Sequence, residues 1–128
     1  MSETTGLMQI GELAERTGLS LRTLRHYDEV GLLRASIRSE GGFRLYSADD
    51  LSRLLLIRRM KPLGFSLEEM SELLAVIDAL DSEDDTGGDQ QRVRVDLERF
   101  IADTAARRAK LQEQLDMADE FLALLHAR

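Results

Sequence analysis

Arginine, tyrosine and histidine side chains concentrate in one stretch of this sequence, GLSLRTLRHYDEVGLLRASIRSEGGFRLY, from Gly18 to Tyr46. The whole chain has a net charge of -7, yet residues 1–65 carry 10 Lys and Arg against 8 Asp and Glu, whereas residues 66–128 carry 7 against 16. Phosphate binding needs a local cationic face, because salt screens each charge beyond roughly 10 Å. The segment therefore predicts a nucleic-acid-binding surface on an otherwise acidic protein.

Glycine and serine positions divide the start of this segment into two short helices. Gly18 is placed to end a helix over Gly11–Thr17. Ser20 can cap a second helix from Leu21 to about Val30, which Gly31 closes. Two short helices around a tight turn are typical of a helix-turn-helix motif.

The second helix has an outward face that suits DNA. At 100° per residue its two leucines point inward, so Arg22, Thr23 and His26 point outward and Tyr27 lies on the flank. Outward residues of a second helix enter the major groove, where Arg can bind a guanine edge or a phosphate. For each residue alone the alternative is a solvated side chain, or half-buried packing in the case of Tyr27.

Other cations near this helix have two possible roles. Arg25 lies closer to the protein side and either contacts a phosphate or pairs with Asp28 or Glu29. Arginines flanking the wing loop and at the end of the third helix are either phosphate contacts or solvated. The DNA-contact candidates are therefore Ser20, Arg22, Thr23, Arg25, His26, Tyr27, Arg34, Arg38, Arg44, Tyr46, Arg58 and Arg59.

A short β-hairpin is predicted between residues 32 and 46, where the helical period disappears. Gly41-Gly42 offers the positive φ angles of a hairpin turn. Strand alternation places Phe43 and Leu45 on one side, which we expect to pack, and Arg44 and Tyr46 on the other, which we expect to reach outward. This hairpin would form a small wing.

Two further helices complete the predicted DNA-binding domain, residues 1–80. Ser47 and Asp50 resemble a capping box for a third helix that ends near Lys61-Pro62, and Ser66 with Glu69 repeats the device for a fourth. Leucines at helical spacing follow each cap. These elements predict a head with its own core.

An acidic, glycine-containing linker is predicted over residues 81–88. A long helix is predicted to follow over residues 89–128, which contain neither Pro nor Gly. The helix would be about 58 Å long at 1.5 Å per residue, too long to bury its apolar stripe on a small head. It needs a partner helix, most simply its own copy in a homodimer. The stripe keeps steps of four and three through Leu97, Ile101, Thr104, Arg108, Leu111, Leu115, Ala118, Leu122 and Leu125.

Arg108 interrupts this stripe. Its side chain either snorkels to solvent, fixes the register of the pair, or contributes to a ligand pocket.

The sequence lacks the residues that metal sites, enzymes and membrane proteins need. There is no cysteine and there are two histidines, so we expect no metal site and no cofactor. No acid and base pair around a pocket, phosphate loop or nucleophile arrangement is found, so we do not expect an enzyme. No leader or membrane-spanning segment is found, so we expect a cytoplasmic protein associated with the nucleoid and no membrane partner.

Three motifs, IGELAERTGLSLRTLRHYDEVGLL, GGFRLYSADDL and IRRMKPLGFSLEEM, lie in order over roughly residues 9 to 75. On these motifs the chain resembles the MerR-type transcriptional regulators. The resemblance implies a winged-helix head whose long helix pairs antiparallel in a homodimer, each head binding half of an inverted repeat in promoter DNA. It also implies that the dimer bends and untwists an overlong promoter spacer and so realigns it for RNA polymerase. It assigns DNA contact to Arg22, Thr23, His26, Tyr27 and Arg44.

The chain departs from the sensing members of that family. It lacks their cysteines and stops at Arg128 as the helix finishes, so we expect no separate effector domain. The expectation is a regulator controlled by its own abundance, or one that senses an unidentified small molecule or protein at the dimer interface. The alternatives are an architectural or recombination-directionality DNA-binding protein, and a coiled-coil adaptor for protein interactions.

Overall fold

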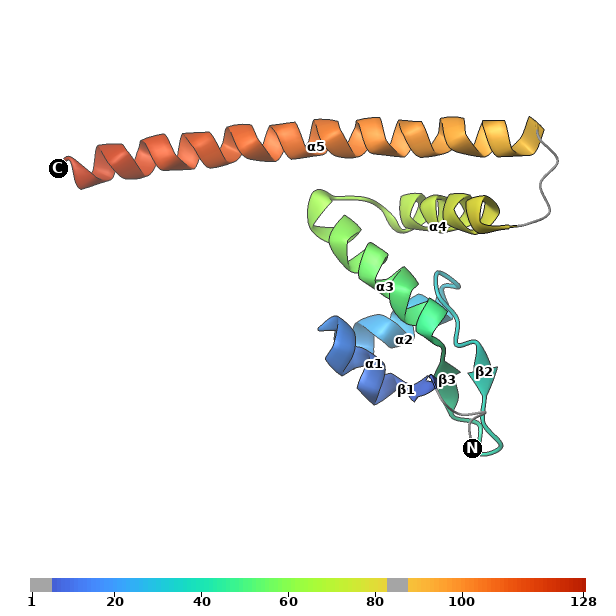
Figure 1. The fold of residues 1–128 in the computed structure, drawn as a ribbon. Helices are drawn as coiled ribbons and strands as arrows, with labels where there is room; N and C mark the ends of the chain where they lie inside the picture. Colours follow the sequence, from blue (N-terminus) through green and yellow to red (C-terminus); the bar gives the residue numbers. More distant parts are fainter. Residues whose placement is uncertain (1–5, 83–87) are drawn as a thin grey trace. The chain divides into compact units, whose positions relative to one another are not determined.

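The computed structural model describes residues 6–82 and 88–128, and it is mainly helical with one small sheet (Figure 1). The chain divides into two compact units, one up to Leu74 and one from Ala75 onward. The elements confirm the predicted class, a winged helix-turn-helix head followed by a long helix. In chain order they are β1 (Met8–Gln9), α1 (Ile10–Thr17), α2 (Leu21–Glu29), β2 (Ile37–Arg38), β3 (Arg44–Tyr46), α3 (Ala48–Met60), the 3₁₀ turn η2 (Lys61–Leu63), α4 (Leu67–Asp81) and α5 (Gly88–His126).

The helix-turn-helix forms because the facing ends of α1 and α2 are fixed by local chemistry. Gly18 adopts a left-handed φ of 73°, which ends α1. The Ser20 hydroxyl accepts a hydrogen bond from the Thr23 N–H at 3.0 Å and so caps α2. Thr17 and Leu24 are 0% and 2% exposed, and they join the two helices to the core. Both predicted boundaries at this turn are confirmed.

The wing is an antiparallel three-stranded sheet in the order β1-β3-β2. Met8 pairs with Tyr46, and Ile37 pairs with Leu45. At the hairpin turn Gly42 has a φ of +83°, and this one residue supplies the positive φ that was expected of both glycines. The hairpin is therefore confirmed, and β1 adds a third strand to it.

The predicted orientation of the wing is wrong. Tyr46 is 1% exposed and Phe43 is 63% exposed, the reverse of the expectation. The alternation itself holds, but Met8, 5% exposed, lies opposite Tyr46 across the β1-β3 pair. Directly paired residues share a face of the sheet, so pairing with β1 turns Arg44 and Tyr46 toward the core.

A capping box begins α3, as predicted. The Ser47 N–H donates to Asp50 Oδ2 at 2.9 Å, and the Asp50 N–H donates to Ser47 Oγ at 3.1 Å. Leu54 and Ile57 of this helix are 0% exposed. Because α3 contacts both α1 and β3, its buried face forms the centre of the head.

The turn between α3 and α4 is built around Pro62 in η2 and a left-handed Gly64 with a φ of 85°. The Ser66 N–H donates to Glu69 Oε1 at 2.8 Å, and the Glu69 N–H donates to Ser66 Oγ at 3.1 Å. The second predicted capping box is thereby confirmed.

The second unit contains the 39-residue helix α5. The predicted linker lies mostly outside the described residues, and its first and last positions, Asp81 and Gly88, belong to α4 and α5. The division between the units falls within α4, and the predicted domain limits stay predictions. Of the helices in the described ranges, none is both long and apolar enough to cross a bilayer.

Candidate nucleic-acid interface

The outward face of α2 carries the side chains that the sequence placed there. Arg22, Arg25 and His26 are exposed, and Thr23 is half-buried. The Ser20 hydroxyl donates to Thr23 Oγ1 at 2.9 Å, so the capping residue also orients the threonine hydroxyl. This face therefore presents two guanidinium groups, an imidazole and a hydroxyl.

Arg25 makes no ion pair with Asp28 or Glu29 in the described part of the chain. The Asp28 carboxylate pairs instead with the Arg44 guanidinium from β3. The internal alternative for Arg25 therefore loses its main partner, and the exposed side chain stays available on the surface of α2.

The Arg44–Asp28 ion pair joins the wing to the recognition helix. The Asp28 side chain is 11% exposed and that of Arg44 is 34% exposed. The expectation that Arg44 reaches away from the protein is wrong, because the strand face that carries it points toward α2. The pair sets the position of β3 against α2, so it acts on the geometry of the whole candidate interface.

Both tyrosines are more buried than the sequence suggested. Tyr27 is 4% exposed, and burial raises the pKa of its phenol. Tyr46 lies within the core and cannot reach a ligand, so its assignment as a DNA contact is corrected. Burial raises the Tyr46 pKa first, and the nearby Asp28 and Asp50 carboxylates raise it further.

The remaining candidate arginines are exposed, and three of them also bond to backbone carbonyls. Arg58 Nη1 donates to the carbonyl of Thr17 at 2.8 Å and so stabilises the end of α1. Arg38 Nη1 donates to Gly42 O at 3.2 Å across the hairpin, and Arg59 Nη1 donates to Leu55 O at 3.0 Å within α3. The fourth arginine, Arg34, is exposed and its guanidinium lies beside Gly31. These bonds give the three arginines structural roles that the sequence did not predict.

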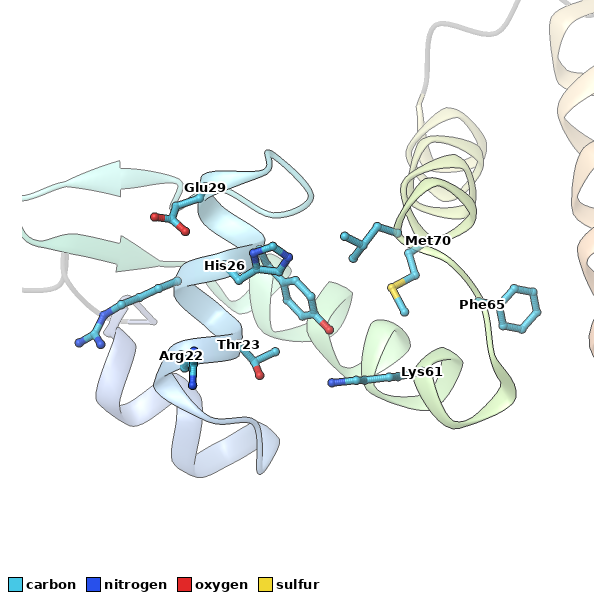
Figure 2. A pocket seen from close by; sticks show the side chains of 10 residues that line it. Arg22, Thr23, His26, Glu29, Lys61, Phe65 and Met70 are labelled. Carbon is cyan, nitrogen blue, oxygen red and sulfur yellow. The ribbon is translucent and has the colours of Figure 1, made fainter.

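A cleft of about 880 Å³ opens in front of α2. Figure 2 shows Thr23 and His26 on α2 facing Lys61 and Met70 across this space, which Arg22 also lines. Nothing in the spacing of residues 61–70 indicates that Lys61 and Met70 face α2. The sequence placed Lys61 only near the end of the third helix, and the structure places it across the cleft from α2.

Removing the Asp28 charge should destabilise the head. We expect Asp28→Asn to lower the free energy of unfolding by about 1–3 kcal/mol, because the half-buried Arg44 guanidinium loses its counter-charge. Urea unfolding measures the effect. The control is Asp49→Asn, whose carboxylate is 84% exposed and 3.9 Å from Arg53, and which should change stability by less than about 1 kcal/mol. Equal losses in the two variants would contradict a special role for the Asp28 pair.

Comparison with known proteins decides the family. The family model described as "MerR HTH family regulatory protein" matches residues 8–76, and one described as "MerR, DNA binding" matches residues 51–120. The chain belongs to the MerR family. The MerR resemblance inferred from the three sequence motifs is thereby confirmed.

MerR family relatives match over different lengths. The nodulation protein NolA of Bradyrhizobium elkanii is 48% identical over 66 residues, which are 52% of this chain and 30% of that protein. The chain thus spans less than a third of that relative. The HTH-type transcriptional regulator HmrR of Rhizobium leguminosarum bv. viciae is 36% identical over 122 residues, which are 94% of this chain and 85% of that protein.

A solved MerR family structure is also similar. HiNmlR, described as a MerR family regulator lacking the sensor domain, was crystallised bound to promoter DNA. It aligns with a TM-score of 0.68 and 29% identity over 91% of this chain and 88% of that chain. The likeness extends beyond the head into the long helix that follows.

The stripe on α5 is exposed over its C-terminal part in the single chain. Residues of the stripe from Arg108 onward are exposed, and Leu111, Leu115, Leu122 and Leu125 are 44–56% exposed. A second apolar stripe was not predicted: Met117, Phe121 and Leu124 are 61–69% exposed. At 100° per residue it lies about 110° around the helix from the first stripe.

Proposed function

We propose that the protein is a sequence-specific, DNA-binding transcription regulator that binds an inverted repeat in promoter DNA as a homodimer. The observation that carries the proposal is the exposed cationic face of α2, held beside a wing by the Asp28–Arg44 pair. A protruding helix with two arginines is suited to a major groove. The DNA-bound structure of HiNmlR, a relative with the same architecture, supports this assignment.

The proposed dimer forms through the leucine stripe of α5, paired antiparallel with its copy. A homodimer has two-fold symmetry and therefore suits an inverted repeat. We infer that the dimer bends and untwists its site and so changes how RNA polymerase uses the promoter, as the family resemblance implies. This activity would place the protein on the nucleoid in the cytoplasm.

Footprinting over the DNA upstream of the protein's own gene tests the function. We expect a protected palindrome between promoter elements whose spacing is too long. Protection without symmetry, or binding that excess nonspecific DNA abolishes, would contradict the proposal.

Arg22 is the side chain whose removal should weaken DNA binding most directly. If Arg22 binds a base edge, Arg22→Ala costs about 1–3 kcal/mol of binding free energy, and if it binds a phosphate the salt slope falls by about one. Titration of operator DNA at several salt concentrations separates the two. The matched control is Arg99→Ala on α5, whose side chain is 73% exposed and pairs with Asp96. Unchanged affinity and slope in Arg22→Ala would remove this residue from the interface.

A further inference from the structure

The cleft in front of α2 has the size of a small-molecule site. Its volume of about 880 Å³ falls within the range of roughly 300–1,000 Å³ that is typical of ligand pockets. One wall is the outward face of α2, and the other is formed by η2 and the first turn of α4 (Figure 2). All of these residues belong to the first compact unit.

Part of the cleft wall consists of apolar groups, which do not bind DNA phosphates. Met70 and Tyr27 are 2% and 4% exposed, and Leu67 lies beside them at 39%. The Met70 thioether and the Leu67 isobutyl group give nothing to a phosphate oxygen, whereas they and the ring of Tyr27 can pack against an aromatic or aliphatic body.

The rest of the wall is cationic. Arg22, Arg25 and Lys61 line the cleft, and within the described ranges none of them pairs with a carboxylate. Of the described residues that line it, only Glu29 is acidic. Figure 2 shows Lys61 extending toward α2, so positive charge comes from both walls. Guanidinium and ammonium groups bind carboxylate, sulfonate or phosphate groups with charge-assisted hydrogen bonds.

We propose that this cleft binds an amphipathic organic anion, whose charged group contacts Arg22, Arg25 or Lys61 and whose apolar body packs on Leu67 and the exposed edges of Met70 and Tyr27. Because Arg22 also belongs to the proposed DNA interface, anion and DNA exclude each other. The exclusion rests on the proposed function, whereas binding of the anion does not. A sensor would then lie within the DNA-binding head itself and need neither cysteine nor a second domain.

Methionine methyl groups report on the site directly. The full chain, labelled with carbon-13 at its methionine methyls, is titrated with 8-anilinonaphthalene-1-sulfonate, an aromatic anion. We expect a saturable shift of the Met70 methyl, while Met117, 69% exposed on α5, stays in place. A shift of Met117 without Met70 would overturn the proposal, because the dye would then be binding the apolar stripe of α5.

The two lysines of the chain, Lys61 and Lys110, provide a matched pair of variants. Lys61→Gln should weaken binding of the sulfonate by about fivefold, the effect of losing one exposed charge pair. Lys110→Gln removes the same charge from α5 and should leave the affinity unchanged. Equal affinities in the two variants would overturn the assignment of the cationic wall.

Competition with DNA tests the exclusion. The apparent dissociation constant for operator DNA should rise in proportion to one plus the ratio of sulfonate concentration to its own dissociation constant. Unchanged DNA affinity at saturating sulfonate would overturn the exclusion. If the protein alone failed to bind DNA, the proposed function would fail, and the Met70 titration would still decide whether the anion site exists.

Discussion

Replacing both Leu111 and Leu115 with aspartate should convert the proposed dimer to monomers with poor operator affinity. The two side chains are 44% and 56% exposed in the single chain, and each occurs twice in a symmetric dimer. Losing about 1.5 kcal/mol of burial at each of these four sites predicts a dimer dissociation constant raised by at least about 10⁴-fold. Operator affinity falls by about 10² to 10⁴, because the second head no longer binds intramolecularly.

Sedimentation equilibrium and titration with full and half operators measure these effects. The control is Ala102→Asp with Ala109→Asp, two exposed positions one heptad apart on the opposite side of α5. The control adds the same charge to the same helix and should remain a dimer. A dimer formed by the Leu111 and Leu115 variant would show that another surface holds the chains together.

Tyr46 gives the second large effect, on stability. Tyr46→Ala should lower the free energy of unfolding by about 3–5 kcal/mol, because it empties the site of a core aromatic ring that is 1% exposed. Tyr46→Phe should raise stability by about 1 kcal/mol, since the phenol oxygen is buried and lacks a hydrogen-bond partner among the described residues. Chemical denaturation of the three proteins measures both changes.

Measurements at high pH distinguish the contribution of the Tyr46 hydroxyl to stability from that of its ring. The pKa of Tyr46 in the folded protein is raised above the ordinary value of 10.0, so its contribution to stability is complete below pH 10 and decreases above it. Tyr46→Phe should therefore lose less stability above pH 10 than the parent does. Weakened DNA binding by a stable Tyr46→Phe protein would instead support the outward orientation that the sequence suggested.

The helix ends were predictable because their chemistry is local. Ser20, Ser47 and Ser66 each bond to a residue three positions later, so the sequence alone contains both partners. The outward face of α2 followed from helical periodicity in the same way. The sequence therefore predicted the helix boundaries of the head and the exposed residues of α2 at the centre of the candidate interface.

The wing could not be oriented from its own residues. A strand of three residues has two possible faces, and both Phe43 and Tyr46 are large enough to fill a core. The choice depends on β1, which pairs Met8 with a residue 38 positions later. Alternation shows which residues of a strand share a face, and long-range pairing determines which face points to the core.

The ion pair and the cleft were missed for a similar reason. Asp28 has Arg25 nearby on its own helix, so helical spacing favoured that partner, but the fold brings Arg44 from 16 positions away. Lys61 and Met70 likewise face α2 only after η2 has turned the chain. Side chains from separate elements converge according to tertiary packing, which local periodicity does not contain.

From Leu111 to His126 every residue of α5 is exposed in the single chain. A helix segment without neighbours lacks the tertiary packing that supplies most of the stability of helices in proteins. If pairing supplies the missing burial, then ordering of this segment depends on how many copies the cell contains. The melting temperature would rise with protein concentration, and growth or division that dilutes the copies would reduce the number of paired heads. The exposed stripe of one helix would thus make occupancy of the promoter depend on the concentration of the protein.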